Sequence, residues 1–145
     1  MYELAKEHNA LMVDVEHRFY GRSLPTKDVS TASLALLSSD QALADLARVI
    51  NYVKKELFDS PHSKVITTGG SYPGNLSGWF RLKYPSVTHG SIASPAPVRA
   101  KANFKEYMDV VGEAMLYFGG QPCYDAFEKA ANHISKLASE GPGSE

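Results

Sequence analysis

The sequence has a single cysteine, Cys123, and a single tryptophan among its 145 residues. One cysteine cannot close a disulfide within the chain, which excludes a small domain stapled by internal bridges. Its thiol is either unpaired or one half of a bridge to a partner elsewhere. Long apolar runs are also missing, so we predict no membrane-spanning helix. The first 15 residues mix acidic and basic side chains where a signal peptide needs an apolar stretch, and no targeting segment is predicted.

An excess of charge of one sign is missing too. The chain has 15 Lys and Arg against 16 Asp and Glu, for a formal net charge of -1, and its basic residues are dispersed. This distribution argues against binding to nucleic acid or to an acidic membrane surface. We expect neither a metal site nor a cofactor. The composition, 43% hydrophobic and 21% charged, is that of an ordinary globular domain long enough to bury a core.

Three short apolar runs have the character of buried parallel strands. They are residues 10–15 (ALMVDV), residues 64–70 (KVITTGG) and residues 88–94 (THGSIAS). Helical patterns lie between them, the first opened by an S-x-x-Q capping box at Ser38 and Gln41. Strands that alternate with helices predict an α/β fold, here with three parallel strands joined by right-handed crossover helices.

The pattern changes after Pro97 to helices alone. A capping pattern predicts that the first of them starts at Asn103, and the two glycines at 119–120 predict a break before the second. We therefore predict two parts: residues 1–98 as part of an α/β core, and residues 99–145 as the start of a separate helical region.

The segment with the clearest chemical character joins the second strand to its helix. Here Ser71 follows Gly69 and Gly70, and Tyr72 and Gly74 come after it. A sharp strand-to-helix turn exposes its serine at the carboxyl edge of a sheet and aims the next backbone N–H at a developing oxyanion. Such a strained turn needs small neighbours, which the glycines supply. The segment therefore resembles the nucleophile elbow of α/β-hydrolases.

The elbow pattern departs from G-x-S-x-G at one position, because Pro73 replaces the last glycine. A proline in the first turn of a helix breaks no intrahelical hydrogen bond, and the Tyr72 N–H is retained. An alternative is a glycine-rich turn that binds phosphate at the helix N-terminus. This alternative is weaker, since no lysine follows as in a P-loop.

Four segments together resemble family S28 serine peptidases, which include prolyl carboxypeptidases, dipeptidyl-peptidase II and the thymus-specific serine protease. The similarity runs in register from Tyr2 to the Cys123 region, and four motifs in order are more specific than one elbow. The segments are EHRFYGRSLP, LSSDQALADLARVINYVKKEL, GGSYPGNLSGWFRLKYP and SIASPAPVRAKANFKEYMDVV.

The resemblance implies a partial α/β-hydrolase core followed by the start of a helical insertion, or cap, domain. Family members use a Ser-Asp-His triad, in which Ser71 matches the nucleophile and Tyr72 the backbone donor of the oxyanion hole. Glu16, His17 and Arg18 match a family motif that we interpret as structural, held by charge pairing, rather than catalytic.

The acid and the histidine of the triad have no match in this chain. In α/β-hydrolases they follow the serine, on loops after later strands, and no strand is predicted after Pro97. Asp109 or Asp125 with His133 would satisfy the order, but these residues fall within helical stripes. The other histidines, His8, His62 and His89, are interpreted as surface or packing residues.

The resemblance also implies that the segment is truncated at both ends. On this view Cys123 pairs with a cysteine beyond Glu145, and the full-length protein is lysosomal or secreted. Asn75-Leu76-Ser77 is formally a glycosylation sequon. Because it lies in the helix behind the nucleophile, we expect it to be buried and unmodified.

Three functions remain open on the sequence alone. The first is a serine exopeptidase that cleaves next to proline, as a carboxypeptidase or a dipeptidyl-peptidase, with Ser71 as nucleophile. The second is a truncated product without activity, which we expect of the isolated chain. The third is an esterase or lipase on the same fold, against which the four motifs argue. The expected partners are proline-containing peptides, and the full-length protein is compatible with a homodimer.

Overall fold

A computed structural model describes residues 1–141, which fall into two compact units. The units are Met1–Arg99 and Ala100–Glu145, and the second is described to residue 141. None of the described helices combines the length and the apolar character that crossing a membrane requires. That the first unit is a hydrolase core and the second a cap stays a prediction.

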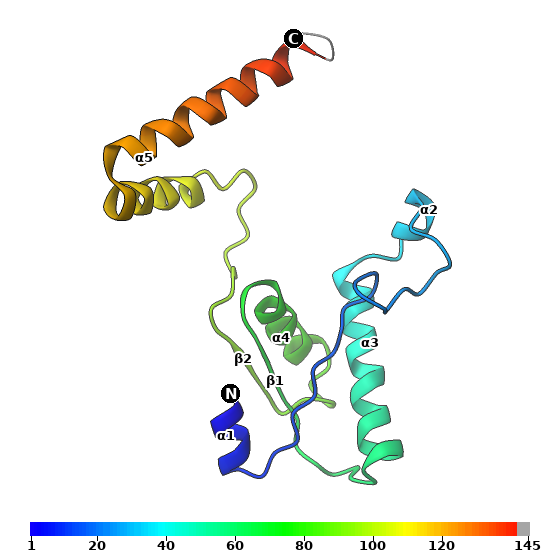
Figure 1. The fold of residues 1–145 in the computed structure, drawn as a ribbon. Coiled ribbons are helices and arrows are strands. Elements are labelled where there is room, and N and C mark those ends of the chain that lie inside the picture. Colours follow the sequence, from blue (N-terminus) through cyan, green and yellow to red (C-terminus); the bar gives the residue numbers. More distant parts are fainter. Residues whose placement is uncertain (142–145) are drawn as a thin grey trace. The chain divides into compact units, whose positions relative to one another are not determined.

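The first unit begins with helices and ends in a strand-helix-strand segment (Figure 1). Its elements are α1 (Tyr2–Glu7), α2 (Thr31–Leu34), α3 (Ser39–Tyr52), the π-helical turn η1 (Val53–Leu57), β1 (Ile66–Gly69), α4 (Ser71–Lys83) and β2 (Gly90–Ala93).

The centre of this unit is a β1-α4-β2 crossover. The two strands pair in parallel, with Ile66 opposite Gly90 and Gly69 opposite Ala93. Helix α4 packs against both strands, and α3 packs against α4 (Figure 1). The Ser77 hydroxyl of α4 donates a 3.0 Å hydrogen bond to the Thr67 hydroxyl of β1, which joins the helix to the sheet. The predicted strands at 64–70 and 88–94 are confirmed, both shorter than expected.

The third predicted strand, at residues 10–15, is not confirmed. This segment has no regular secondary structure, and the described sheet has two strands. Leu11, Met12 and Val13 are exposed. A β-strand exists only through hydrogen bonds to a neighbour, and within residues 1–141 the backbone of this segment has no strand beside it. Apolar composition alone therefore did not determine a strand.

The capping box predicted at Ser38 is confirmed on its serine side. The Ser38 hydroxyl accepts a 3.3 Å hydrogen bond from the Gln41 N–H, and α3 begins at the next residue. Leu43 of α3 and Phe80 of α4 are the hydrophobic side chains buried within the described residues. Phe80 also stacks on Tyr84, with ring centroids 4.9 Å apart.

The second unit contains the helical segment α5 (Glu106–Glu140), which bends at Gly120 (Figure 1). Gly120 has a φ of 72°, a left-handed conformation that glycine adopts without strain, so the predicted break at 119–120 is confirmed. The predicted helix start at Asn103 is wrong. The helix begins three residues later, because Asn103 itself has a φ of 51° and its side chain caps no helical N–H.

The second unit exposes large apolar side chains, and this leads to a prediction for the isolated chain. Tyr117 and Phe118 are 84% and 85% exposed, and Met108, Phe127 and Ile134 are also exposed. Extensive exposed apolar surface favours association. We expect the isolated 145-residue chain to elute as aggregates in size-exclusion chromatography and to melt without a cooperative transition. A compact monomer with a sharp melt would contradict this expectation.

Candidate functional site

The strand-to-helix turn around Ser71 has the geometry predicted for it. Strand β1 ends at Gly69, Gly70 is the N-cap, and α4 begins at Ser71. Ser71 is exposed and has a φ of 56°, in the left-handed region that residues other than glycine rarely adopt. Its N–H donates a 2.5 Å hydrogen bond to the carbonyl oxygen of Pro95, beyond the end of β2. The turn therefore holds a strained serine at the carboxyl edge of the sheet, where the side chain is accessible.

Two of the three glycines at this turn lie too close to other atoms to carry a side chain. A Cβ added at Gly69 would lie 2.3 Å from the carbonyl carbon of Pro73, and one at Gly74 would lie 2.8 Å from the Gly69 oxygen. A Cβ at Gly70 would meet nothing closer than 3.8 Å. The expectation that all three glycines are needed for space is therefore wrong for Gly70. Pro73 lies in the first turn of α4, where its missing N–H removes no helical bond.

The backbone N–H of Tyr72 is available at the N-terminus of α4. The residue four positions earlier is Thr68, in β1, and within residues 1–141 the Tyr72 N–H donates no hydrogen bond. Unpaired N–H groups at a helix N-terminus, together with the helix dipole, favour negative charge in front of them. This N–H is therefore suited to donate a hydrogen bond to an oxyanion that develops beside Ser71.

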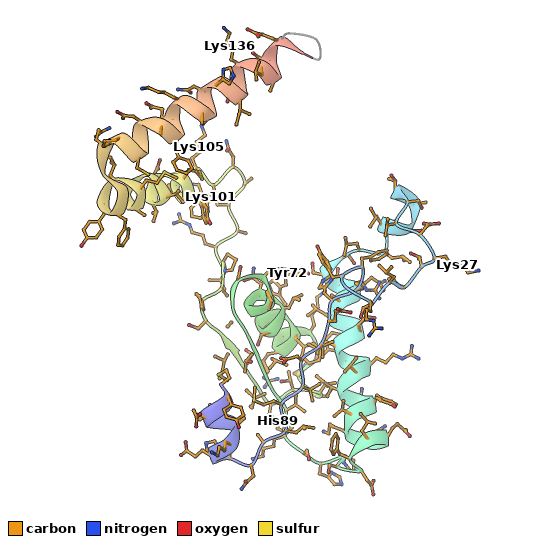
Figure 2. The ribbon with its side chains drawn as sticks, viewed as in Figure 1. Lys27, Tyr72, His89, Lys101, Lys105 and Lys136 are labelled. Atoms are coloured by element: carbon orange, nitrogen blue, oxygen red, sulfur yellow. The ribbon has the colours of Figure 1, made fainter. Side chains whose placement is uncertain are left out.

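Tyr72 lies at the start of α4 (Figure 2), and its side chain is held by a distant segment of the chain. Its hydroxyl lies 3.1 Å from Nε2 of His17, a residue 55 positions earlier in the sequence. Burial raises the pKa of the Tyr72 hydroxyl, and the influence of Ser39 at the start of α3 lowers it by less. No local sequence pattern predicts this contact, which sequence reasoning missed.

The motif Glu16-His17-Arg18 is held by its two charged residues. Arg18 forms a bidentate ion pair with Asp45 of α3, with Nε–Oδ2 and Nη2–Oδ1 distances of 2.7 and 2.8 Å. Its Nη1 also donates to the Leu36 carbonyl oxygen. The Arg18 side chain is 12% exposed and that of Asp45 42%, so the pair is only partly buried. The predicted charge pairing is confirmed for Arg18.

Glu16 stabilises the loop that follows it instead of pairing with a cation. Its carboxylate accepts hydrogen bonds from the Ser23 hydroxyl at 2.6 Å and from the Arg22 N–H at 3.0 Å. These two bonds, the Ser23 hydroxyl first, lower the pKa of the Glu16 carboxyl. Because the charged form is the better acceptor, the loop is most strongly held when Glu16 is ionised.

A cavity of about 390 Å³ adjoins the turn on the Tyr72 side. Its walls come from the Glu16–Arg18 motif, from α3 and from the first turn of α4. Ser71 does not line it, whereas Tyr72 and Pro73 do. Five aliphatic side chains also line it, those of Val15, Ala42, Leu43, Leu46 and Leu76.

The acid and base candidates of the second unit are not arranged as a pair. Asp125 and His133 lie on the same helical half of α5, about two turns or roughly 12 Å apart along the axis. Asp125 accepts a 2.7 Å hydrogen bond from the Gln121 amide, and Asp109 lies before the bend at Gly120. These positions support the interpretation that they form no triad. Within residues 1–141 no three His, Cys, Asp or Glu side chains gather in a way suited to a metal ion.

The remaining sequence candidates have packing roles or stay untested. His89 lies at the amino end of β2 (Figure 2). Its ring accepts a 3.3 Å hydrogen bond from the Val65 N–H. In the sequon, Asn75 donates to the Pro97 carbonyl oxygen and Ser77 is 3% exposed, as expected for a buried segment. Cys123 is a half-buried free thiol in this chain, and its pairing stays a prediction.

Comparisons with known proteins show the family to which the chain belongs. The family described as serine carboxypeptidase S28 matches residues 1–145. Prolyl carboxy peptidase like protein 5 of Caenorhabditis elegans is 50% identical over 151 residues, covering 99% of this chain and 29% of that protein. Lysosomal Pro-X carboxypeptidase of Mus musculus is 37% identical over 149 residues, covering 99% and 30%. Thymus-specific serine protease of Homo sapiens is 43% identical over 113 residues, covering 78% and 22%.

The chain thus spans between 22% and 30% of the length of these relatives. The family match extends over every residue of the chain, including the turn at Ser71 and the motif at Glu16–Arg18. Two of these relatives are at least 43% identical to the chain. The chain belongs to the serine carboxypeptidase S28 family.

Proposed function

We propose that the full-length gene product carrying this segment is a serine-type exopeptidase that cleaves peptides next to proline, with Ser71 as its nucleophile. The observation that carries the proposal is the left-handed φ of 56° at Ser71, one residue after a parallel strand and at the first position of a helix. This strained turn is what a nucleophile elbow requires. Membership of the S28 family supports peptides as the substrate class.

In the proposed reaction the Ser71 Oγ attacks the carbonyl carbon of the scissile bond. A histidine base from outside this segment takes the serine proton and then gives it to the leaving amine. The oxyanion that forms accepts a hydrogen bond from the Tyr72 N–H. Collapse of this intermediate releases the amine and leaves an acyl-enzyme, which water hydrolyses. The triad acid and histidine are expected outside residues 1–145.

The preference for proline rests on the relatives, since two of them are named as a prolyl carboxy peptidase like protein and a Pro-X carboxypeptidase. The same comparison supports a lysosomal site of action, with secretion as the alternative. The cavity beside Tyr72 is lined in part by aliphatic side chains, which suits an apolar side chain of the substrate.

The test is hydrolysis by the purified full-length gene product of peptides that differ only in the position of proline. Cleavage after a penultimate proline, unaffected by N-acetylation, indicates a carboxypeptidase. Cleavage after a proline at position two, blocked by N-acetylation, indicates a dipeptidyl-peptidase.

A fluorophosphonate should label Ser71, as located by mass spectrometry. Hydrolysis of esters alone would favour the esterase alternative, and absence of both turnover and labelling would refute the proposal. The isolated 145-residue chain is expected to be inactive.

A further inference from the structure

We propose that His17 is a positioning residue for the oxyanion hole: it holds the Tyr72 side chain and thereby fixes the Tyr72 backbone N–H. This inference rests on the proposed function, because it assigns a role to His17 in stabilising the oxyanion. His17 comes from a loop before α2, far from Ser71 in the sequence, and the mechanism above gives it no task.

The direction of the hydrogen bond follows from the second nitrogen of the ring. Nδ1 of His17 lies 2.8 Å from the Arg18 carbonyl oxygen, which can only accept, so Nδ1 carries a proton. In the neutral imidazole Nε2 is then an acceptor, and the Tyr72 hydroxyl donates to it at 3.1 Å. The two rings also touch, with centroids 5.6 Å apart. The tautomer of His17 therefore allows Nε2 to accept a hydrogen bond from the Tyr72 hydroxyl.

His17 is itself rigidly placed by its two neighbours in the motif. Arg18 attaches the loop to α3 through two hydrogen bonds to Asp45, and a third bond joins it to Leu36 in the segment before α3. Glu16 closes the other side of the loop through the Ser23 hydroxyl and the Arg22 N–H. The charged residues thus position the loop, and the histidine between them reaches Tyr72. The histidine of the motif is thereby assigned a role distinct from those of its two neighbours.

The peptide group between Ser71 and Tyr72 carries the proposed oxyanion donor. Two features of this group favour a change in its orientation. Ser71 occupies a strained conformation with a φ of 56°, and the Tyr72 N–H has no hydrogen bond within residues 1–141. Two contacts oppose relaxation. Ahead of the plane the Ser71 N–H is bonded to Pro95, and after it the Tyr72 side chain is bonded to His17. Preorganised donors of this kind are what oxyanion stabilisation depends on.

The experiment compares His17→Leu, Tyr72→Phe and the double variant in the full-length gene product. Each single variant should lower kcat by about 10- to 100-fold with KM changed less than about threefold, because a misplaced donor weakens the transition state more than substrate binding. The double variant should be no worse than either single one, since both remove the same contact. The side-chain oxygen of Gln in His17→Gln can accept a hydrogen bond from the Tyr72 hydroxyl. This variant should therefore keep most of the wild-type kcat.

A matched control separates positioning from stability. His89→Leu removes another histidine acceptor, that of the Val65 N–H, at the amino end of β2. It should lower the melting temperature and leave kcat unchanged. Affinity for a peptide boronic acid, whose tetrahedral adduct with Ser71 imitates the intermediate, should fall with kcat in the His17 and Tyr72 variants and stay constant in the control.

Each outcome decides a different claim. If the wild-type protein hydrolyses no peptide, the proposed function fails and this inference falls with it. If the wild type is active but His17→Leu keeps its kcat and its affinity for the boronic acid, only the inference is overturned. Additive losses in the double variant, or a His17→Gln variant as slow as His17→Leu, would also overturn it.

Discussion

Replacing Ser71 by alanine in the full-length gene product is expected to lower kcat/KM for peptide hydrolysis by about 10⁴-fold or more. The reason is chemical, because alanine has no oxygen at the position of the serine Oγ. The Tyr72 N–H and the strand-to-helix turn would remain, so substrate binding should change little. Steady-state kinetics on the best peptide substrate measure the loss, and residual turnover above about 1% of the wild-type value would contradict the assignment.

Two further variants control for folding. Ser71→Gly removes the same oxygen but relieves the backbone strain, because glycine tolerates the φ of 56°. It should be as inactive as Ser71→Ala, and its free energy of unfolding should exceed that of Ser71→Ala by about 1 kcal/mol. Ser86→Ala removes a hydroxyl from an exposed serine after α4 and should leave both activity and melting temperature unchanged. If the alanine and glycine variants had the same free energy of unfolding, the backbone at residue 71 would not be strained in solution.

Local features of the fold were predictable from the sequence, because their causes lie within a few residues. The capping serine at Ser38 and the glycine break at Gly120 each follow from residues close in the sequence. The turn at Ser71 was predictable for the same reason, since a strained strand-to-helix junction needs small residues close in sequence.

Features that depend on distant partners were not predictable. The segment at 10–15 has strand-like composition, yet a strand needs a paired neighbour, and none lies beside it within residues 1–141. The contact between His17 and Tyr72 joins residues 55 positions apart, and that between Arg18 and Asp45 joins residues 27 apart. The motif could be noticed in the sequence, but the division of roles among its three residues needed the three-dimensional arrangement.

Replacing Gly69 by alanine is expected to damage the same turn through its backbone. The added Cβ would lie 2.3 Å from the carbonyl carbon of Pro73, 2.4 Å from its oxygen and 2.7 Å from the Gly74 nitrogen. These are backbone atoms of the first turn of α4, so no side-chain rotation can relieve the contact. Helix α4 would have to move away from β1. We expect a loss of at least about 2 kcal/mol in the free energy of unfolding of the full-length gene product, measured by denaturant titration.

Gly70→Ala is the matched control, because it adds the same methyl group one residue later in open space. Its Cβ would lie 3.8 Å from the nearest atom, Cδ of Pro95, and Gly70 has an extended backbone with a φ of -109° that alanine adopts readily. This variant should stay within about 0.5 kcal/mol of the wild type. Movement of α4 in Gly69→Ala should also displace Ser71 and Tyr72, so kcat should fall in whatever fraction remains folded. If Gly69→Ala were as stable and as active as Gly70→Ala, the close approach of α4 to β1 would be wrong, and with it the spatial reason for a glycine before the elbow.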